Sequence, residues 1–210
     1  MKYILIILIS LTSCTFSHEM KRTYDFSKQF LGNELTRHMP TDISLNTSFV
    51  STNISKSMNL EVLKNGFTPL LTFIVEKYNE ANFKTIINNL NIDSNNCYEC
   101  NDTNSILIGS YLKHKYGYFE FIGFKSGKES RMIISRNERN KNNKPIPVFN
   151  LTECNSSFRV CVIEANYGIF LNERYLSTEN LMPTNWEHGY SMGYTISKKE
   201  RMIIYWTVVW

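Results

Sequence analysis

The pattern of residues 190–210 constrains the fold more than any other part of the sequence. Between Tyr190 and Ser197, large apolar residues alternate with small or hydroxyl-bearing ones. This period of two predicts a strand with one buried face and one face in water. The turn sequence Lys198-Lys199-Glu200 follows, and residues 202–210 are apolar on both faces. We therefore expect a terminal hairpin whose last strand is central in a sheet or covered by another layer.

A different period, of three and four residues, marks the stretch from about 58 to 90. It predicts helix, because side chains at these spacings share one helical face. Thr68-Pro69 suits a helix start, since the missing N–H of proline costs nothing in the first turn. We interpret the apolar stripe as core packing. Its members are Leu63, Phe67, Leu70, Leu71, Ile74 and Tyr78, followed by Phe83, Ile86, Ile87 and Leu90.

Short strand-like runs fill the chain after Asn104. Together with the helical stretch they predict an α+β fold, in which a helical N-terminal half (57–95) packs on an antiparallel β meander of about five to seven strands (105–210). Because 42% of the residues are hydrophobic, the chain can bury such a core, and we expect residues 57–210 to form a single domain. The expected strands are 105–112, 116–124, 131–135, 158–164, 169–171, 190–197 and 202–210.

The first fourteen residues predict where the chain goes. Lys2 is followed by an apolar run, 3–9, which is shorter than the roughly 20 residues of a membrane-spanning helix and is typical of an export signal. Leu11-Thr12-Ser13-Cys14 comes next and resembles the lipobox of bacterial lipoprotein precursors. The resemblance implies removal of a signal peptide, 1–13, and attachment of fatty acyl chains such as palmitate to Cys14.

Two or three acyl chains on one residue anchor a protein stably, whereas one chain binds a membrane only weakly. We therefore expect a membrane-anchored, extracytoplasmic protein of the bacterial cell envelope, on the outer membrane if the cell is Gram-negative. Residues 14–56 are polar and predict a membrane tether, with one short element near 24–35.

A second interpretation of the N-terminus is the ordinary cleaved signal peptide of a secreted, disulfide-bonded glycoprotein from a eukaryote or virus. Five Asn-X-Ser/Thr triplets would then be glycan acceptors. A chain so rich in Asn, Ser and Thr also contains some of these triplets by chance. They begin at Asn46, Asn53, Asn101, Asn150 and Asn155.

Four cysteines follow Cys14, namely Cys97, Cys100, Cys154 and Cys161. An even number of cysteines in an exported domain predicts structural disulfides, and all three pairings are open. Zinc binding is disfavoured because the second pair is too widely spaced for a zinc knuckle. Redox chemistry is disfavoured because a reactive Cys-X-X-Cys normally begins a helix, whereas turn residues follow this one.

One segment matches a catalytic motif. Gly189-Tyr190-Ser191-Met192-Gly193 has the Gly-X-Ser-X-Gly pattern of the α/β-hydrolase nucleophile elbow, and His188 precedes it. The elbow needs a strand, a sharp turn and a helix, whereas this segment alternates as one strand and no His follows Ser191. The two glycines are better explained by close approach of a neighbour or by a bulge. An envelope hydrolase using His188 and Ser191 is the alternative function, and we assign no catalytic residue.

Binding is favoured over catalysis by the rest of the sequence. We expect no cofactor and no metal, since none of the four histidines is spaced as a paired metal ligand. Tyr167, Tyr175, Trp186 and Tyr190 are candidate binding-surface residues, because Tyr and Trp give a large contact area at low entropic cost. Core packing explains each of the four equally well.

Positive charge is concentrated between Lys113 and Lys144. This segment has nine Lys or Arg and three Glu, a local excess of six charges against +4 for the whole chain. A solvated loop has the same composition. As a contact surface, residues 113–144 would suit anionic lipid headgroups or glycans, and we expect no nucleic acid partner for an exported chain. The sequence thus predicts a lipid-anchored binding domain and leaves its ligand and any protein partner open.

Overall fold

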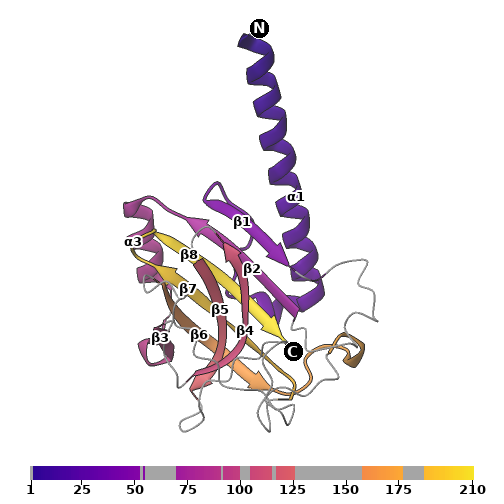
Figure 1. Ribbon diagram of the computed structural model, residues 1–210, viewed down its shortest axis with the longest axis vertical. Coiled ribbons are helices and arrows are strands. Elements are labelled where there is room, and N and C mark those ends of the chain that lie inside the picture. Colours follow the sequence, from indigo (N-terminus) through magenta and orange to yellow (C-terminus); the bar gives the residue numbers. More distant parts are fainter. Residues whose placement is uncertain are drawn as a thin grey trace.

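The fold is built on an antiparallel sheet to which most of the described strands belong. The structure, a computed structural model, describes residues 2–52, 54, 70–90, 92–99, 105–114, 117–125, 158–176 and 187–210. Its strands are β1 (Thr47–Thr52), β2 (Leu70–Lys77), β3 (Cys97–Glu99), β4 (Ser105–His114), β5 (Gly117–Lys125), β6 (Phe158–Tyr167), β7 (Gly189–Ser197) and β8 (Met202–Val209). Six of them form one sheet in the order β1-β2-β8-β7-β6-β3, and β4 and β5 form a separate hairpin (Figure 1).

In the described part of the chain, two helices accompany the sheet. The first, α1 (Lys2–Thr36), extends from the body at its N-terminal end, and its C-terminal half packs beside β1 and β2 (Figure 1). The second, α3 (Glu80–Asn89), lies at the end of the sheet where β7 turns into β8 (Figure 1). Two single 3₁₀ turns, η1 (Ser94–Asn96) and η2 (Glu173–Tyr175), complete the described elements. Within the described residues, neither helix combines the length and the apolar character that crossing a membrane would require.

The expected fold, a helical half at 57–95 packed on a β meander, is wrong. Within that range α3 is the described helix, and 70–77 forms strand β2 in place of the expected helix. The sheet is not a meander, because β8 pairs with β2 on one side and with β7 on the other. The error has a physical cause: β2 is buried at every position except Lys77, so its sequence shows no period of two.

The segment expected to act as a polar tether also contributes to the folded body. Tyr24, Ser27, Leu31 and Leu35 are buried and share one face of α1, at spacings of three and four. Gly32 interrupts the helix with a φ of 79°, a conformation that glycine adopts without strain. Residues 47–52 then add β1 to the sheet.

Several expected strands are confirmed. The terminal hairpin forms, and β8 is central as expected. Residues 105–112, 116–124 and 158–164 correspond closely to β4, β5 and β6. The expected strand 169–171 is wrong, because these residues lie in bends and loop between β6 and η2. Residues 131–135 lie outside the described part of the chain.

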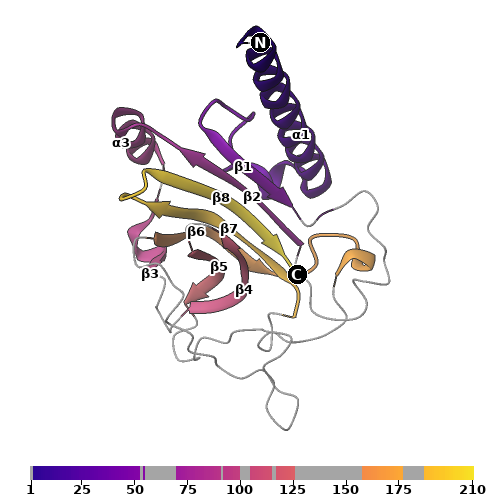
Figure 2. The same ribbon diagram turned by 45° about the horizontal axis from the view of Figure 1, so that its top comes forward.

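Strand β7 differs from expectation in one respect: all nine of its residues are buried, so it has no face in water. Its large residues pack with α1 and α3 against one face of the sheet. The β4–β5 hairpin lies over β6 and β7 from the other side, as Figure 2 shows. The small residues of β7 therefore face the side of the hairpin, and this part of the sheet has neighbouring elements on both sides.

The glycines of β7 allow this close packing. A Cβ on Gly193 would overlap the carbonyl oxygen of Cys161 and lie 2.8 Å from a ring carbon of Trp206. A Cβ on Gly189 would lie 2.6 Å from the carbonyl oxygen of Asn166 and 2.8 Å from the ring of Trp210. Both tryptophans are fully buried. The close approach inferred for these glycines from the sequence is confirmed.

Candidate functional site

The four aromatic residues proposed as a binding surface occupy different environments. Tyr167 ends β6 and is 66% exposed. Tyr175 is half-buried, with its ring 5.0 Å from that of Phe30 in an edge-to-face contact. Tyr190 is buried, and its hydroxyl donates a hydrogen bond to Glu164. Trp186 lies outside the described residues. The three described tyrosines are thus exposed, half-buried and buried, respectively.

The geometry around Ser191 does not form a nucleophile elbow. Ser191, the third residue of β7, is fully buried opposite Ala165 on one side and Val208 on the other. The strand continues through it without the sharp turn that exposes a catalytic serine. His188 precedes the strand, and its backbone carbonyl accepts a hydrogen bond from Gly168. Among the described residues, no group of three or more His, Cys, Asp or Glu side chains is arranged to hold a metal ion.

A disulfide joins Cys97 of β3 to Cys161 of β6. The two residues face each other directly in the antiparallel register, so the bond attaches a three-residue edge strand to the sheet. The bond joins the first and the last of the four cysteines that follow Cys14. It therefore does not close a local turn between Cys97 and Cys100 or between Cys154 and Cys161. Cys100 and Cys154 lie outside the described residues.

A groove runs beneath α3 at the end of the sheet that carries this disulfide. We call it the α3 groove; it consists of two hollows that share the side chains of Ile87 and Lys198. The hollow between α3 and the β7–β8 turn has a volume of about 620 Å³. The hollow beside the disulfide has a volume of about 480 Å³. Both volumes are in the range of small-molecule sites.

The walls of the α3 groove are held by local hydrogen bonds. The side chain of Asn79 caps α3 by accepting a hydrogen bond from the backbone N–H of Asn82 at 2.9 Å. The backbone N–H of Tyr78 donates to the carbonyl of Arg201 at 2.9 Å, which ties the start of α3 to the β7–β8 turn. Arg201 itself has a φ of 50°, and this left-handed conformation closes the turn.

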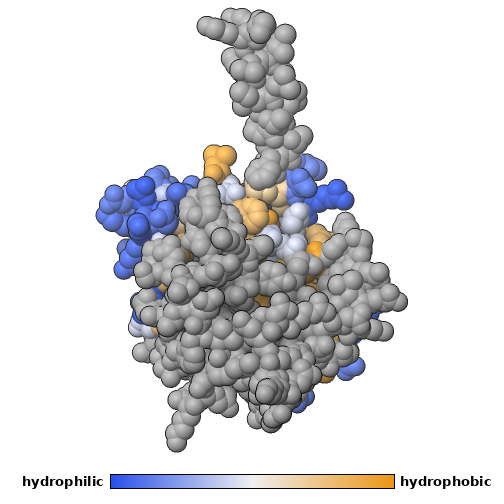
Figure 3. Space-filling model, viewed as in Figure 1, coloured by the Kyte–Doolittle hydropathy of each residue, from blue (hydrophilic) through white to orange (hydrophobic). Residues whose placement is uncertain are grey.

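The two hollows differ in chemistry. The hollow at the turn is rimmed by four exposed cations, Lys84, Lys198, Lys199 and Arg201. The disulfide hollow is lined by the disulfide, by three polar side chains and by five apolar ones: Ser94, Arg159 and Lys198, and Ile87, Leu90, Ile92, Phe158 and Ile196. Hydrophilic residues gather on the outer surface over α3, as Figure 3 shows. The α3 groove therefore combines a basic end with an apolar end.

One acid lies within the basic end. The Glu80 carboxylate accepts a hydrogen bond from Lys84 at 2.7 Å, and this contact lowers the pKa of Glu80. None of the four ion pairs found among the described residues involves Lys198, Lys199 or Arg201. Three of the four cations at this end are thus exposed without an ion pair in the described part of the chain.

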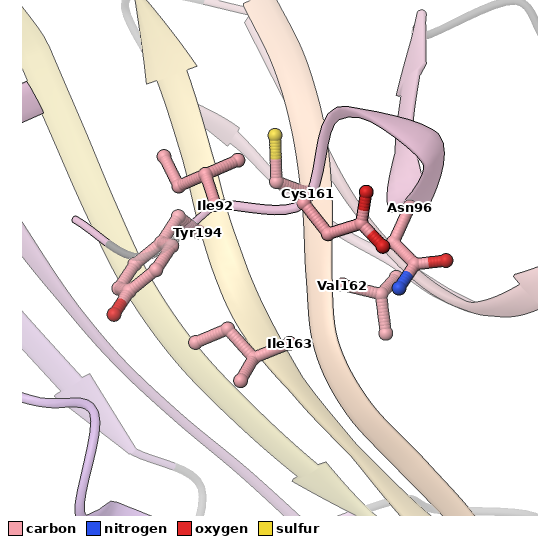
Figure 4. A pocket seen from close by; sticks show the side chains of 7 residues that line it. Ile92, Asn96, Cys161, Val162, Ile163 and Tyr194 are labelled. Carbon is pink, nitrogen blue, oxygen red and sulfur yellow. The ribbon is translucent and has the colours of Figure 1, made fainter. Parts of the chain in front are cut away.

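A third hollow, of about 350 Å³, lies beside Cys161 (Figure 4). It shares Ile92 and Cys161 with the disulfide hollow. Figure 4 shows Tyr194 at one end and Asn96 at the opposite end, with Ile163 between them. Burial raises the pKa of Tyr194, which therefore stays a neutral phenol at ordinary pH.

Buried polar groups elsewhere serve to attach α1 and the following loop to the sheet. Glu76, only 3% exposed, accepts hydrogen bonds from Ser44 Oγ at 3.2 Å and Thr47 Oγ1 at 3.3 Å, and also from the Tyr78 hydroxyl. Thr207 Oγ1 donates to the carbonyl of Leu35 at 2.6 Å. Because these contacts join α1 and the loop after it to β2 and β8, we interpret them as structural.

His38 makes a similar contact between the end of α1 and β8. Its Nε2 lies 2.9 Å from the carbonyl oxygen of Trp206, and because a carbonyl only accepts, Nε2 carries the proton. Its Nδ1 is buried with no hydrogen-bond partner among the described residues. Burial lowers the pKa of His38 to about 4.

The sequence interpretation did not identify the α3 groove. The basic end could have been recognised from the sequence, because three of the four residues in 198–201 are cations. The apolar end has no such signal, since its side chains come from segments some 100 residues apart. Residues 113–144, the proposed basic contact, are described only in part and without their side chains, so that contact stays a prediction.

Comparison with known proteins adds no assignment. No family model matches the chain, and neither a curated protein nor a solved structure is significantly similar to it.

Proposed function

We propose that the chain is an exported binding domain, anchored to a membrane through acyl chains on Cys14, and that the α3 groove is its ligand site. The observation that carries the binding role is the pairing of a basic rim with an apolar hollow in one groove. Sites of this size that combine apolar walls with a few charged groups are typical of small-ligand binding.

The anchor is supported by the lipobox-like sequence and fits the geometry of α1. Cys14 precedes Tyr24, a fully buried residue on α1, by ten residues. At 1.5 Å per helical residue, these two positions are about 15 Å apart along the helix axis. With Cys14 acylated, this helix would hold the sheet away from the membrane surface. The helix would thus do what the sequence predicts of a flexible tether.

The disulfide supports an extracytoplasmic location. Structural disulfides persist in oxidising compartments and are rare in the cytosol. The Cys97–Cys161 bond closes a sequence separation of 64 residues. In the chain-entropy description, a loop of that length stabilises the fold by about 4 kcal/mol.

Metabolic labelling tests the anchor. The full chain is expressed in a bacterium supplied with labelled palmitate, and the label is expected on the wild type and not on Cys14→Ser. Cys97→Ser, which removes a different cysteine, is expected to retain the label. A mature N-terminus at another residue would contradict the anchor. Glycans on Asn53 or Asn150 after expression in a eukaryotic cell would instead support the secreted glycoprotein.

Peptide mapping tests the compartment. Protein purified from the envelope without reductant is digested, and the Cys97 and Cys161 peptides are expected as one linked species that reductant separates. With that pair formed, Cys100 and Cys154 remain to pair with each other. Four free thiols in natively exported protein would oppose the proposal.

A further inference from the structure

The ligand class follows from how charge and apolar surface are distributed along the α3 groove. Cations are most numerous at the β7–β8 turn, whereas the disulfide hollow has more apolar side chains and includes two cations, Arg159 and Lys198. Ile87 and Lys198 line both hollows, which are therefore neighbours. A ligand with an anionic end and an apolar end would therefore complement the two hollows together.

We propose that the α3 groove binds a single-chain anionic amphiphile, with its carboxylate or phosphate between Lys198 and Arg201 and its alkyl chain beside Ile87, Leu90 and Ile92. This inference rests on the proposed binding function and specifies the ligand. The alkyl chain gains by covering apolar surface, at roughly 0.8 kcal/mol per buried methylene. The cations supply charge complementarity for the head.

Size and charge favour a monomeric amphiphile. Hollows of about 620 and 480 Å³ suit a molecule of small-ligand size. The head faces three cations that form no ion pair among the described residues, whereas the Glu80 carboxylate is already engaged by Lys84. An anion is thus attracted to the turn and is not opposed by a free acid in the described part of the rim.

The amphiphile binds as a single dissolved molecule and not as part of the surface of an intact bilayer. The apolar hollow is lined by residues from α3, β6 and β7, including Ile87, Phe158 and Ile196. Phe158 and Ile196 are buried, so an alkyl chain reaches them only by entering the hollow as a separate molecule. A flat membrane surface would contact the exposed lysines alone.

Calorimetric titration with decanoate tests the proposal. The full chain carries Cys14→Ser, so that no attached acyl chain competes, and decanol serves as the neutral ligand of equal chain length. Saturable binding of decanoate is expected, several-fold tighter than that of decanol. Octanoate is expected to bind more weakly than decanoate because it buries two fewer methylenes. Added salt is expected to weaken decanoate binding and to spare decanol binding.

Two variants locate the site. Lys198→Gln/Lys199→Gln is expected to weaken decanoate binding roughly five-fold without changing decanol binding, since exposed charge contacts are individually modest. Lys21→Gln/Arg22→Gln removes the same charge from α1 and is expected to have no effect. Ile87→Glu places a carboxylate at a position that lines both hollows and is expected to abolish decanoate binding. Circular dichroism and the intact Cys97–Cys161 bond verify the fold of each variant.

The opposing outcomes are distinct. Equal affinity for decanoate and decanol, or unchanged decanoate binding in Lys198→Gln/Lys199→Gln, would overturn the anionic head. Absence of saturable binding to a folded chain would overturn the amphiphile itself, and the anchored binding domain would still stand if Cys14 is acylated. Binding to vesicles of phosphatidylglycerol and phosphatidylcholine without binding of decanoate would show a surface contact and would also overturn the proposal.

Discussion

Replacing Gly193 with alanine tests whether the covered face of the sheet is packed as tightly as the structure indicates. The added Cβ would overlap the Cys161 carbonyl oxygen and lie 2.8 Å from a ring carbon of Trp206. Ordinary carbon–carbon contacts are about 3.5–4.0 Å, so the ring must move by roughly 1 Å. Neither neighbour moves freely, because the oxygen belongs to the backbone of β6 and Trp206 is fully buried in β8.

Overpacking of a well-packed core costs about 1–3 kcal/mol. We expect Gly193→Ala to cost about 3 kcal/mol, near the upper limit, because one of the two obstructing atoms is main chain. For a domain of this size, each kcal/mol lowers Tm by about 2–4 °C. The expected decrease in Tm is therefore roughly 6–12 °C. Urea unfolding, followed by the fluorescence of the buried tryptophans, measures the free energy of unfolding directly.

The matched control is Thr195→Val, two residues along the same strand and on the same face. Thr195 is buried, and its hydroxyl has no hydrogen-bond partner among the described residues. Valine has nearly the same shape, so the change is expected to be neutral or slightly stabilising. If Gly193→Ala unfolds within 0.5 kcal/mol of the wild type, the close approach of β6 and Trp206 to Gly193 is refuted.

Two further predictions concern the buried polar groups beside α1. Glu76→Ala removes the hydrogen-bond acceptor that Ser44, Thr47 and Tyr78 share. Because their hydroxyl groups would then be left unpaired, we expect the free energy of unfolding to fall by about 3 kcal/mol. A decrease of less than about 1 kcal/mol, measured by urea unfolding, would contradict the hydrogen-bond network around Glu76. The pKa of His38 falls from 6.5 to about 4 on folding. Between pH 6.5 and pH 4 the unfolded chain therefore binds a proton at His38 that the folded chain does not bind. The folded state consequently loses stability as the pH falls through this range. Unfolding at pH 5 and 7.5 should differ by about 2 kcal/mol from this residue, and His38→Gln should remove that part of the difference.

The elements that the sequence predicts correctly are those whose period is visible. In β7 each large residue is followed by a small or hydroxyl-bearing one, and that alternation survives although both faces are buried. α3 places Phe83, Ile86 and Ile87 on one helical face and is helical as expected. The stripe on α1 was also visible, since Tyr24, Leu31 and Leu35 follow helical spacing, yet the polar residues around them indicated a tether.

β2 shows why the remaining elements were not predictable from local pattern. Its sequence is apolar at Leu70, Leu71, Phe73, Ile74 and Val75, and this run fits a helical face as well as a strand buried on both sides. The choice between them is made by β8, which pairs with β2 along its whole length from more than 120 residues away. A single sequence contains no record of that pairing.

The α3 groove and the disulfide depend on one another. The edge strand β3 has three residues, too few to stay paired by its own hydrogen bonds, and its bond to β6 holds the segment that carries Ile92 against the sheet. Ile92 lines both the disulfide hollow and the third hollow. Reduction of Cys97–Cys161 would release a wall of the groove without touching its basic rim. The same covalent bond that indicates an oxidising compartment therefore also shapes the apolar end of the proposed site.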